Sequence, residues 1–122
     1  MPYSKEPTTR TTARLTGCIR WDTIIPVIEI RQTAVFARWL TALRDDRARG
    51  RINARIRRLS IGNPGDVRPV GNGVSEMRID YGPGYRVYYV QRGSTLIVLL
   101  AGGDKRTQEQ DIAVALRLAD EP

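Results

Sequence analysis

Apolar residues recur at helical spacing in two adjacent segments of the chain. In the first segment they fall at i, i+3, i+4 and i+7, as Phe36, Trp39, Leu40 and Leu43. In the second they fall at i, i+4, i+8 and i+11, as Ala48, Ile52, Ile56 and Leu59. Thr33 can cap the first helix, Asp45 or Asp46 can cap the second, and the GNPG run at 62–65 ends it. The pattern therefore predicts a tightly joined helical hairpin.

Alternating apolar and polar residues, the pattern of β-strands, occupy much of the remaining chain. The predicted strands cover residues 24–30, 67–70, 74–81, 85–90 and 95–100. Within 74–81, Met77 and Ile79 face one side, and Glu76 and Arg78 face the other. Because residues 95–100 are apolar on both faces, we expect them to form the central strand of the sheet.

A final helix is predicted after the sequence Gly102-Gly103-Asp104. Its apolar stripe consists of Ile112, Ala115, Leu116 and Ala119. Thr107 and Gln110 have the spacing of a capping box at its start. The order of elements, β-α-α-β-β-β-α, predicts an α+β fold. We expect a mainly antiparallel sheet of about four strands, on which the N-terminal helical hairpin and the C-terminal helix pack.

All of the predicted elements lie in residues 23–122, which we expect to form a single domain. The length of 122 residues is enough for one hydrophobic core. Residues 1–22 show no apolar periodicity. We expect them to be a disordered leader or the product of a start codon placed too early, with a functional basic arm as the alternative.

The composition excludes several kinds of site. The chain has no histidine, which excludes a Ser-His-Asp triad, a histidine-ligated zinc site and a two-histidine ribonuclease site. Its single cysteine, Cys18, excludes a disulfide framework and fits a reducing compartment. The longest purely apolar run, 96–101, is far too short to span a membrane. We therefore expect a cytoplasmic protein without a metal or another cofactor.

The charge balance points to an anionic partner. The chain carries 20 basic and 13 acidic residues, for a net charge of +7. All of the basic residues except Lys5 and Lys105 are arginines, whose planar guanidinium binds phosphate through two parallel hydrogen bonds.

A first basic cluster lies on the second predicted helix. Its members recur at i, i+4, i+8 and i+11, beside the apolar stripe: Arg47, Arg51, Arg55 and Arg58. Such a stripe can follow a phosphate backbone or bind an acidic partner. It is also the pattern of an ordinary solvated helix face.

A second cluster combines tyrosines and arginines on neighbouring strands. Arg86 and Tyr88 alternate with Tyr85 along one strand, and Arg78 lies on the strand before it. Two guanidinium groups beside an aromatic ring can hold a phosphate while a base stacks on the ring. The alternative is that the tyrosines are half-buried strand residues and the arginines simply face outward.

A third cluster, Lys105 and Arg106, opens the last predicted helix. Backbone N–H groups at a helix N-terminus favour anions, and these two cations lie directly beside them. Cations at this end oppose the helix dipole, at a cost of about 0.3–1 kcal/mol each. This placement suggests that they serve a purpose other than stability.

Three basic clusters on one sheet surface would be compatible with chemistry on RNA. Attack of a 2′-hydroxyl on its own phosphate needs mainly orientation and stabilisation of negative charge, which arginine and lysine supply. The reaction also needs a general base. Glu76, which shares a strand face with Arg78, is the only acidic candidate, and a lysine of lowered pKa is the alternative.

The sequence resembles the RelE/ParE superfamily of type II toxin–antitoxin toxins, in particular the HigB-like, phage Gp49-related addiction module killer proteins. The resemblance covers about four-fifths of the chain. It is carried by IRQT at 30–33, RGRINARIRRLSIGNP at 49–64, GDVRPVGNG at 65–73, SEMRIDYGPGYRVYY at 75–89 and LIVLLAGGDKRTQEQDI at 96–112.

The resemblance implies a ribosome-associated mRNA endonuclease that a cognate helix-turn-helix antitoxin holds inactive in a hetero-oligomer. Arg86, the arginine of the family's G-Y-R motif, is then expected to stabilise the scissile phosphate. Lys105 and Arg106 are expected to be acids or phosphate contacts. Arg78 lies on the strand where relatives carry a catalytic lysine or another polar residue.

The chain also departs from the family pattern. Ile112 stands about where some catalytic relatives carry a tyrosine, and no histidine is present. The resemblance therefore assigns neither the general acid nor the general base. Two other functions stay open: inhibition of DNA gyrase, as in the ParE toxins, and simple RNA binding by an inactive relative.

Overall fold

The computed structural model describes residues 28–121. The expected leader, 1–22, and most of the first expected strand, 24–30, lie outside this range. The described elements, in chain order, are β2 (Glu29–Gln32), α1 (Ala34–Ala42), α2 (Asp46–Ser60), β3 (Val67–Gly71), β4 (Val74–Ile79), β5 (Tyr85–Arg92), β6 (Leu96–Gly103), the 3-10 turn η3 (Lys105–Thr107) and α3 (Gln108–Ala119). The helical hairpin and the α+β class are confirmed.

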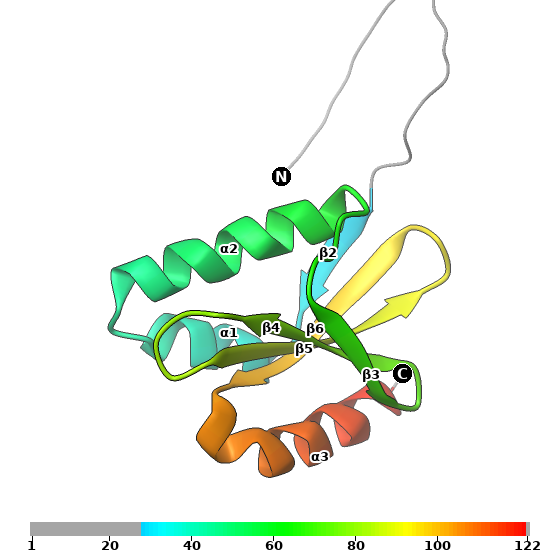
Figure 1. Cartoon of the computed structure of the whole chain (residues 1–122). Coiled ribbons are helices and arrows are strands. Elements are labelled where there is room, and N and C mark those ends of the chain that lie inside the picture. The colour runs from blue at the N-terminus through cyan, green and yellow to red at the C-terminus, as the bar shows by residue number, and fades with distance from the viewer. Residues whose placement is uncertain (1–27, 122) are drawn as a thin grey trace, which may run out of the picture.

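The strands form one sheet in the order β2-β6-β5-β4-β3 (Figure 1). The β2 strand runs parallel to β6, and every other pair is antiparallel. The described sheet therefore has five strands where about four were expected, because the short segment predicted at 67–70 joins the sheet as its edge strand β3, in a hairpin with β4. Asn72 and Gly73 have positive φ angles in the turn of this hairpin.

The prediction that 95–100 forms the central strand is wrong. In the described sheet β6 lies second, between β2 and β5.

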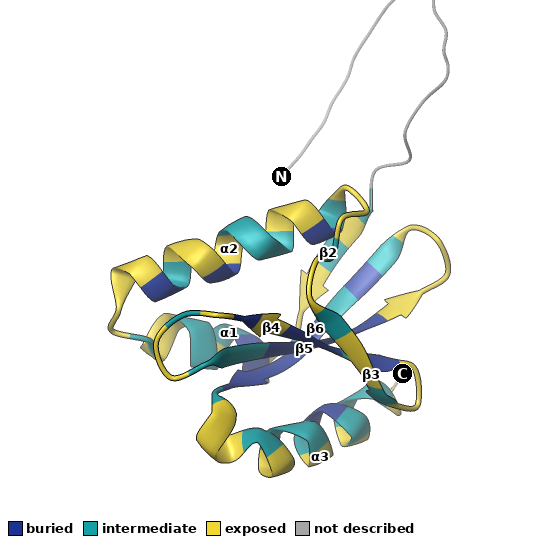
Figure 2. Cartoon of the chain, viewed as in Figure 1, coloured by how far each residue is buried: buried dark blue, intermediate teal, exposed yellow. Residues whose placement is uncertain are grey.

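Helices cover both faces of the sheet, which explains why β6 is apolar on both sides (Figures 1 and 2). The helices α1 and α2 pack on one face. The buried residues of this first core are Phe36, Ile52, Leu59, Met77, Ile79, Val87, Tyr89, Ile97 and Leu99. The helix α3 packs on the opposite face. The buried residues of this second core are Val74, Tyr88, Val90, Leu100, Ala101 and Ala115.

Two of the predicted helix caps are confirmed. The Thr33 hydroxyl accepts a hydrogen bond from the Phe36 amide at 3.0 Å and donates one to the carbonyl of Leu100 at 2.6 Å, which ties the start of α1 to β6. Asp45 caps α2 by accepting hydrogen bonds from the amides of Arg47 and Ala48.

The predicted capping box at the start of α3 is wrong. The Thr107 side chain makes no capping hydrogen bond, and its hydroxyl donates instead to the Asp111 carboxylate at 2.5 Å. The turn η3 precedes α3, and Asp104 caps that turn by accepting a hydrogen bond from the Arg106 amide at 2.8 Å. The capping carboxylate therefore lies one turn earlier than the spacing predicted.

Gly102 and Gly103, which end β6, allow helices to approach the strand from both faces. A Cβ atom on Gly102 would lie 2.2 Å from Trp39 Cε3 of α1. A Cβ atom on Gly103 would lie 1.7 Å from an Asp111 carboxylate oxygen of α3. Both distances are far below van der Waals contact. Close packing therefore explains these two glycines.

None of the helices in the described range is both long and apolar enough to cross a membrane.

We predict that Gly102→Ala lowers the free energy of unfolding by about 1–3 kcal/mol, because Trp39 must leave its position. Gly50→Ala in α2 is the matched control. A Cβ atom at Gly50 meets nothing within 4 Å, so the greater helix propensity of alanine should add about 0.5–1 kcal/mol. Urea denaturation of the two variants measures both effects, and equal stability of the two would contradict the packing argument.

Candidate functional site

The strand register brings the predicted site residues of β4 and β5 side by side. Glu76 lies opposite Tyr88, and Arg78 lies opposite Arg86. On the other side of β4, Arg68 of β3 lies opposite Glu76. Directly opposite residues on antiparallel strands project to the same face. This face is the one that α3 covers.

Glu76 is the centre of a polar cluster beneath α3. Its side chain is completely buried, and no other charged residue in the described range is buried. One carboxylate oxygen accepts a hydrogen bond from Arg68 Nε at 2.9 Å. The other accepts from the Tyr88 hydroxyl at 3.0 Å and from Gln108 Nε2 at 2.8 Å. The donors thus come from β3, β5 and the first residue of α3.

These hydrogen bonds keep Glu76 ionised. Burial alone would raise the pKa of Glu76, but the hydrogen bonds from Arg68, Gln108 and Tyr88 together outweigh it, so the pKa lies below its ordinary value. Burial, followed by the charge of Glu76, raises the pKa of the Tyr88 hydroxyl far above its ordinary value. Tyr88 therefore stays protonated and serves as a donor. Glu76, the candidate general base, has no surface through which it can touch a substrate.

Arg86 lies between the buried cluster and the surface. Its Nε atom is 3.6 Å from a Glu76 carboxylate oxygen, and its side chain is 12% exposed. Its Nη1 atom donates to the carbonyl of Gly84 at 2.9 Å. Both Arg86 and Lys105 approach Gly84 closely. A Cβ atom added to Gly84 would lie 3.4 Å from Arg86 Nη1 and 3.8 Å from Lys105 Cβ. Arg86 and Lys105 therefore both lie beside Gly84, in the turn before β5.

Lys105 and Arg106 are both exposed at the start of η3. The Arg106 guanidinium donates to the Asp104 carboxylate at 2.9 Å, and that hydrogen bond is the main reason why the pKa of Asp104 is lowered. A hollow of about 380 Å³ lies along Lys105, Arg106 and the first residues of α3.

Arg78, Tyr85 and Tyr88, which the sequence placed at the site, each contact other parts of the protein. The exposed Arg78 side chain pairs with Asp66 at 3.0 Å. The ring of Tyr85 lies edge-on to Trp39, with centroids 6.3 Å apart, and burial raises the pKa of its hydroxyl. Tyr88 is completely buried. Its ring therefore presents no open face on which a base could stack.

The arginines of α2 lie over the opposite face of the sheet from Glu76, so the three basic clusters do not share one sheet surface as expected. Arg55 donates through Nη1 to the carbonyl of Arg78 at 2.7 Å and through Nη2 to the carbonyl of Pro64 at 3.0 Å. Arg55 thus fastens α2 to the sheet. Arg51 lies 4.6 Å above the Tyr81 ring, and Arg58 is exposed.

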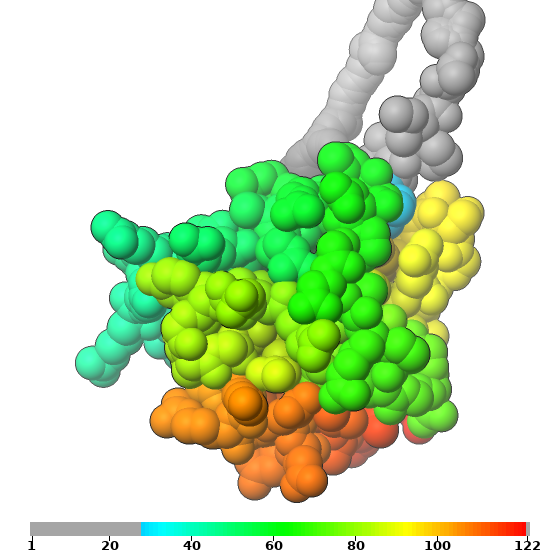
Figure 3. Space-filling model, viewed as in Figure 1, coloured from blue at the N-terminus to red at the C-terminus, as the bar shows by residue number. Residues whose placement is uncertain are grey.

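The segments that carry or adjoin the three basic clusters nevertheless appear on one side of the molecule. Figure 3 shows α2 above, the turn between β4 and β5 in the middle and the start of α3 below. A hollow of about 210 Å³ between α2 and the end of β4 is lined by Arg51, Arg55, Arg58 and Asp80, among others. A phosphate backbone could therefore pass several guanidinium groups on this side.

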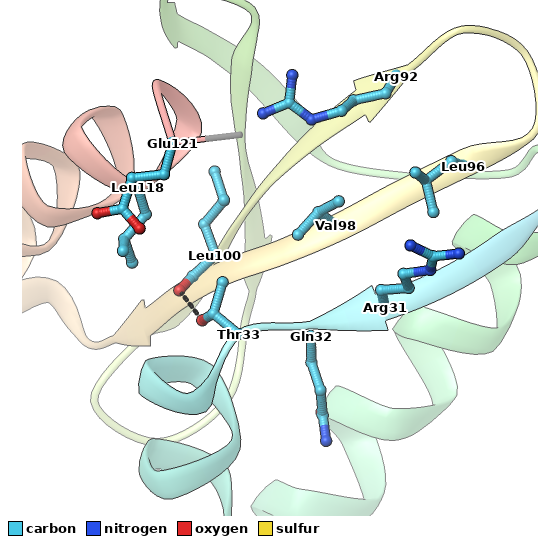
Figure 4. Close-up of a pocket in the computed structure, with 9 residues that line it drawn as sticks. All are labelled: Arg31, Gln32, Thr33, Arg92, Leu96, Val98, Leu100, Leu118 and Glu121. Atoms are coloured by element: carbon cyan, nitrogen blue, oxygen red, sulfur yellow. Dashed lines mark hydrogen bonds between the residues drawn. The ribbon is translucent and has the colours of Figure 1, made fainter.

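A third hollow, of about 340 Å³, lies at the far end of the sheet and contains none of the predicted site residues. Figure 4 shows Leu96 and Val98 of β6 between Arg31 of β2 and Arg92 of β5, with Leu100 further along β6 beside Thr33. Arg92 is six residues from Arg86 along β5, which corresponds to about 20 Å. This hollow is therefore separate from the surface around Arg86.

Sequence reasoning missed three polar residues of the site. Arg68 and Gln108 bind Glu76, and Asp104 caps η3. The signal available for Arg68 was its place in a predicted strand next to 74–81. Nothing in the spacing of Gln108 indicated that it reaches β4. The described residues contain no group of three or more histidine, cysteine, aspartate or glutamate side chains placed to hold a metal ion.

We predict that Glu76 makes stability dependent on acid pH. Because the folded-state pKa of Glu76 is lowered, its contribution is complete above the unfolded-state value of about 4.3 and is lost as the pH falls through the folded-state pKa. Glu76→Gln should lower the free energy of unfolding by about 1–3 kcal/mol at pH 7. Urea denaturation at about pH 7 and pH 3 tests this. A difference from wild type that is as large at pH 3 as at pH 7 would contradict it.

Comparisons with known proteins place the chain in a family. Residues 38–120 match the family model described as phage derived protein Gp49-like (DUF891). An uncharacterized protein of Haemophilus influenzae is 50% identical over 94 residues, which cover 77% of this chain and 95% of that protein. The expected relationship is thereby confirmed at the level of the family. The chain belongs to the Gp49-like family of phage-derived proteins, a family of RelE/HigB-like toxins.

Proposed function

We propose that this protein is the toxin of a type II toxin–antitoxin module and acts as a metal-independent mRNA endonuclease on the ribosome. Membership of the Gp49-like family supports a toxin with an antitoxin partner. The observation that carries the proposed activity is the position of Arg86. Its guanidinium is held between a buried carboxylate and a backbone carbonyl, next to the exposed Lys105.

The proposed reaction is attack of an RNA 2′-hydroxyl on the adjacent phosphate. The 2′-oxygen loses its proton and forms a bond to phosphorus, while the bond from phosphorus to the 5′-oxygen breaks and that oxygen gains a proton. The products are a cyclic phosphate and a free 5′-hydroxyl. Negative charge increases on the non-bridging oxygens in the transition state, where Arg86 and Lys105 can stabilise it. Glu76 takes no part in proton transfer, because its carboxylate is completely buried and cannot touch the RNA.

The neighbouring arginines supply phosphate contacts on either side of the cleavage site. Arg78 and Arg106 are exposed and paired with Asp66 and Asp104, and a phosphate can replace a carboxylate as the bidentate partner. Arg51 and Arg58 of α2 extend the basic surface. A cognate helix-turn-helix antitoxin then holds the toxin inactive in a cytoplasmic hetero-oligomer and covers part of this surface.

We predict that Arg86→Ala abolishes growth arrest in bacteria that express the protein, because the transition-state charge loses its main stabilising group. Arg57→Ala is the matched control. It removes the same charge from an exposed position on α2 and should leave the arrest intact. Mapping of mRNA 5′ ends after induction should show new in-frame cleavage sites with wild type and Arg57→Ala, and none with Arg86→Ala.

Three outcomes would contradict parts of this proposal. If a folded Arg86→Ala variant is as toxic as wild type, the assignment of Arg86 is wrong. Growth arrest by wild type with intact mRNA and a DNA-damage response would favour gyrase inhibition. Absence of arrest would favour an inactive relative that binds RNA or its antitoxin.

We further predict that two arginines of the same helical stripe behave differently. Arg58→Ala should leave stability unchanged, weaken RNA binding and reduce the salt dependence of binding by about one counterion, because Arg58 is exposed. Arg55→Ala should lower the free energy of unfolding by about 1–3 kcal/mol, because the carbonyls of Arg78 and Pro64 lose their donor. RNA binding at several salt concentrations and urea denaturation separate the two effects. A loss of stability in both variants would contradict the distinction.

A further inference from the structure

Glu76 is an unusual residue for the position that it occupies. It is completely buried on a strand, and a buried carboxylate is unfavourable unless charge and hydrogen bonds compensate it. Three hydrogen-bond donors and a second arginine surround it: Arg68 of β3, Tyr88 and Arg86 of β5, and Gln108 of α3. No substrate can reach this carboxylate. Any effect of its charge on a substrate must therefore pass through one of the groups around it.

The four neighbours do not share the carboxylate equally. Arg68, Tyr88 and Gln108 are within hydrogen-bond distance of its oxygens, at 2.8–3.0 Å. Arg86 is not, because its Nε is 3.6 Å from the nearer oxygen and, although buried, has no hydrogen-bond partner. The negative charge of Glu76 thus attracts Arg86, although no hydrogen bond joins the two side chains.

This arrangement leaves the phosphate-binding edge of Arg86 available. A guanidinium has five N–H donors: one on Nε and two on each Nη atom. The carbonyl of Gly84 takes one donor of Nη1, and Nε is buried at 3.6 Å from the Glu76 carboxylate. The second Nη1 donor and the two Nη2 donors remain, which is enough for a bidentate contact with a phosphate.

We propose that Glu76 is a positioning residue for Arg86. The inference rests on the proposed function and gives Glu76 a task within it. The buried carboxylate acts as a fixed counter-ion that holds the inner edge of the Arg86 guanidinium, so that its outer edge meets the scissile phosphate without rearrangement. Arg68, Tyr88 and Gln108 fix the carboxylate in turn. Glu76 is therefore neither a general base nor a phosphate contact.

The test is Glu76→Gln, which keeps the shape of the side chain and removes its charge. Glu29→Gln is the matched control: it makes the same change in an exposed ion pair with Arg31 on β2. In cleavage of ribosome-bound mRNA, we expect Glu76→Gln to lower kcat at least tenfold with KM within threefold of wild type. Glu29→Gln should stay within twofold of wild type in both parameters. A folded Glu76→Gln variant with unchanged kcat would overturn the inference.

A second measurement reads the position of Arg86 without any activity. The Arg86 Nε–H signal in a ¹⁵N NMR spectrum, assigned by its loss in Arg86→Lys, should exchange with water slowly in wild type and in Glu29→Gln. In Glu76→Gln the exchange should be at least tenfold faster. Equal exchange in a folded Glu76→Gln variant would also overturn the inference.

A less disruptive variant covers the case in which Glu76→Gln does not fold. Glu76→Asp keeps the charge but withdraws the carboxylate by one methylene, and it should show faster Nε–H exchange and a lower kcat. Wild-type values in both measurements would overturn the inference. Should wild type itself fail to cleave mRNA while the NMR differences appear, the proposed function would be wrong and the positioning of Arg86 by Glu76 would stand.

Discussion

A single buried negative charge, that of Glu76, determines how four elements meet in this protein. A carboxylate without solvent is tolerated only where donors surround it. Those donors come from β3, β5 and α3, so the cluster forms only when these elements are correctly placed around β4. The same charge faces Arg86 at 3.6 Å. The interaction that organises one face of the sheet therefore also holds the residue to which we assign the chemistry.

Close packing at the end of β6 is the second constraint, and it acts at the same edge of the fold. Trp39 of α1 and Asp111 of α3 approach Gly102 and Gly103 from opposite faces. A larger residue at either position would push a helix layer away from the strand. Because η3 begins two residues after Gly103, this packing also sets where Lys105 leaves the sheet. The glycines thus act on the site through geometry, and no anion is needed to explain them.

Local patterns predicted the elements well, and what they missed has a common physical cause. Alternation in β4 and β5 correctly separated Met77 and Ile79 from Glu76 and Arg78. Alternation cannot say what covers a face, and α3 covers the one that carries Glu76 and Tyr88. The residues named as a possible base and a possible stacking ring are consequently buried. The position of β6 was also out of reach, because apolar faces reveal burial and not which strands lie alongside.

Charge composition is a poor guide to which arginine does what, as the stripe on α2 illustrates. Arg55 and Arg58 are three residues apart, yet Arg55 donates to two backbone carbonyls while Arg58 is exposed. Both Nη atoms of Arg55 already donate to a carbonyl, so no Nη atom of Arg55 is left with both of its donors for a phosphate, whereas Nη2 of Arg86 keeps both. Arg86 differs from Arg55 because its partner attracts it by charge and leaves most of its donors unused. A site without histidine can contribute orientation and stabilisation of charge. For such a site, the number of free donors on one well-placed arginine matters more than the number of arginines.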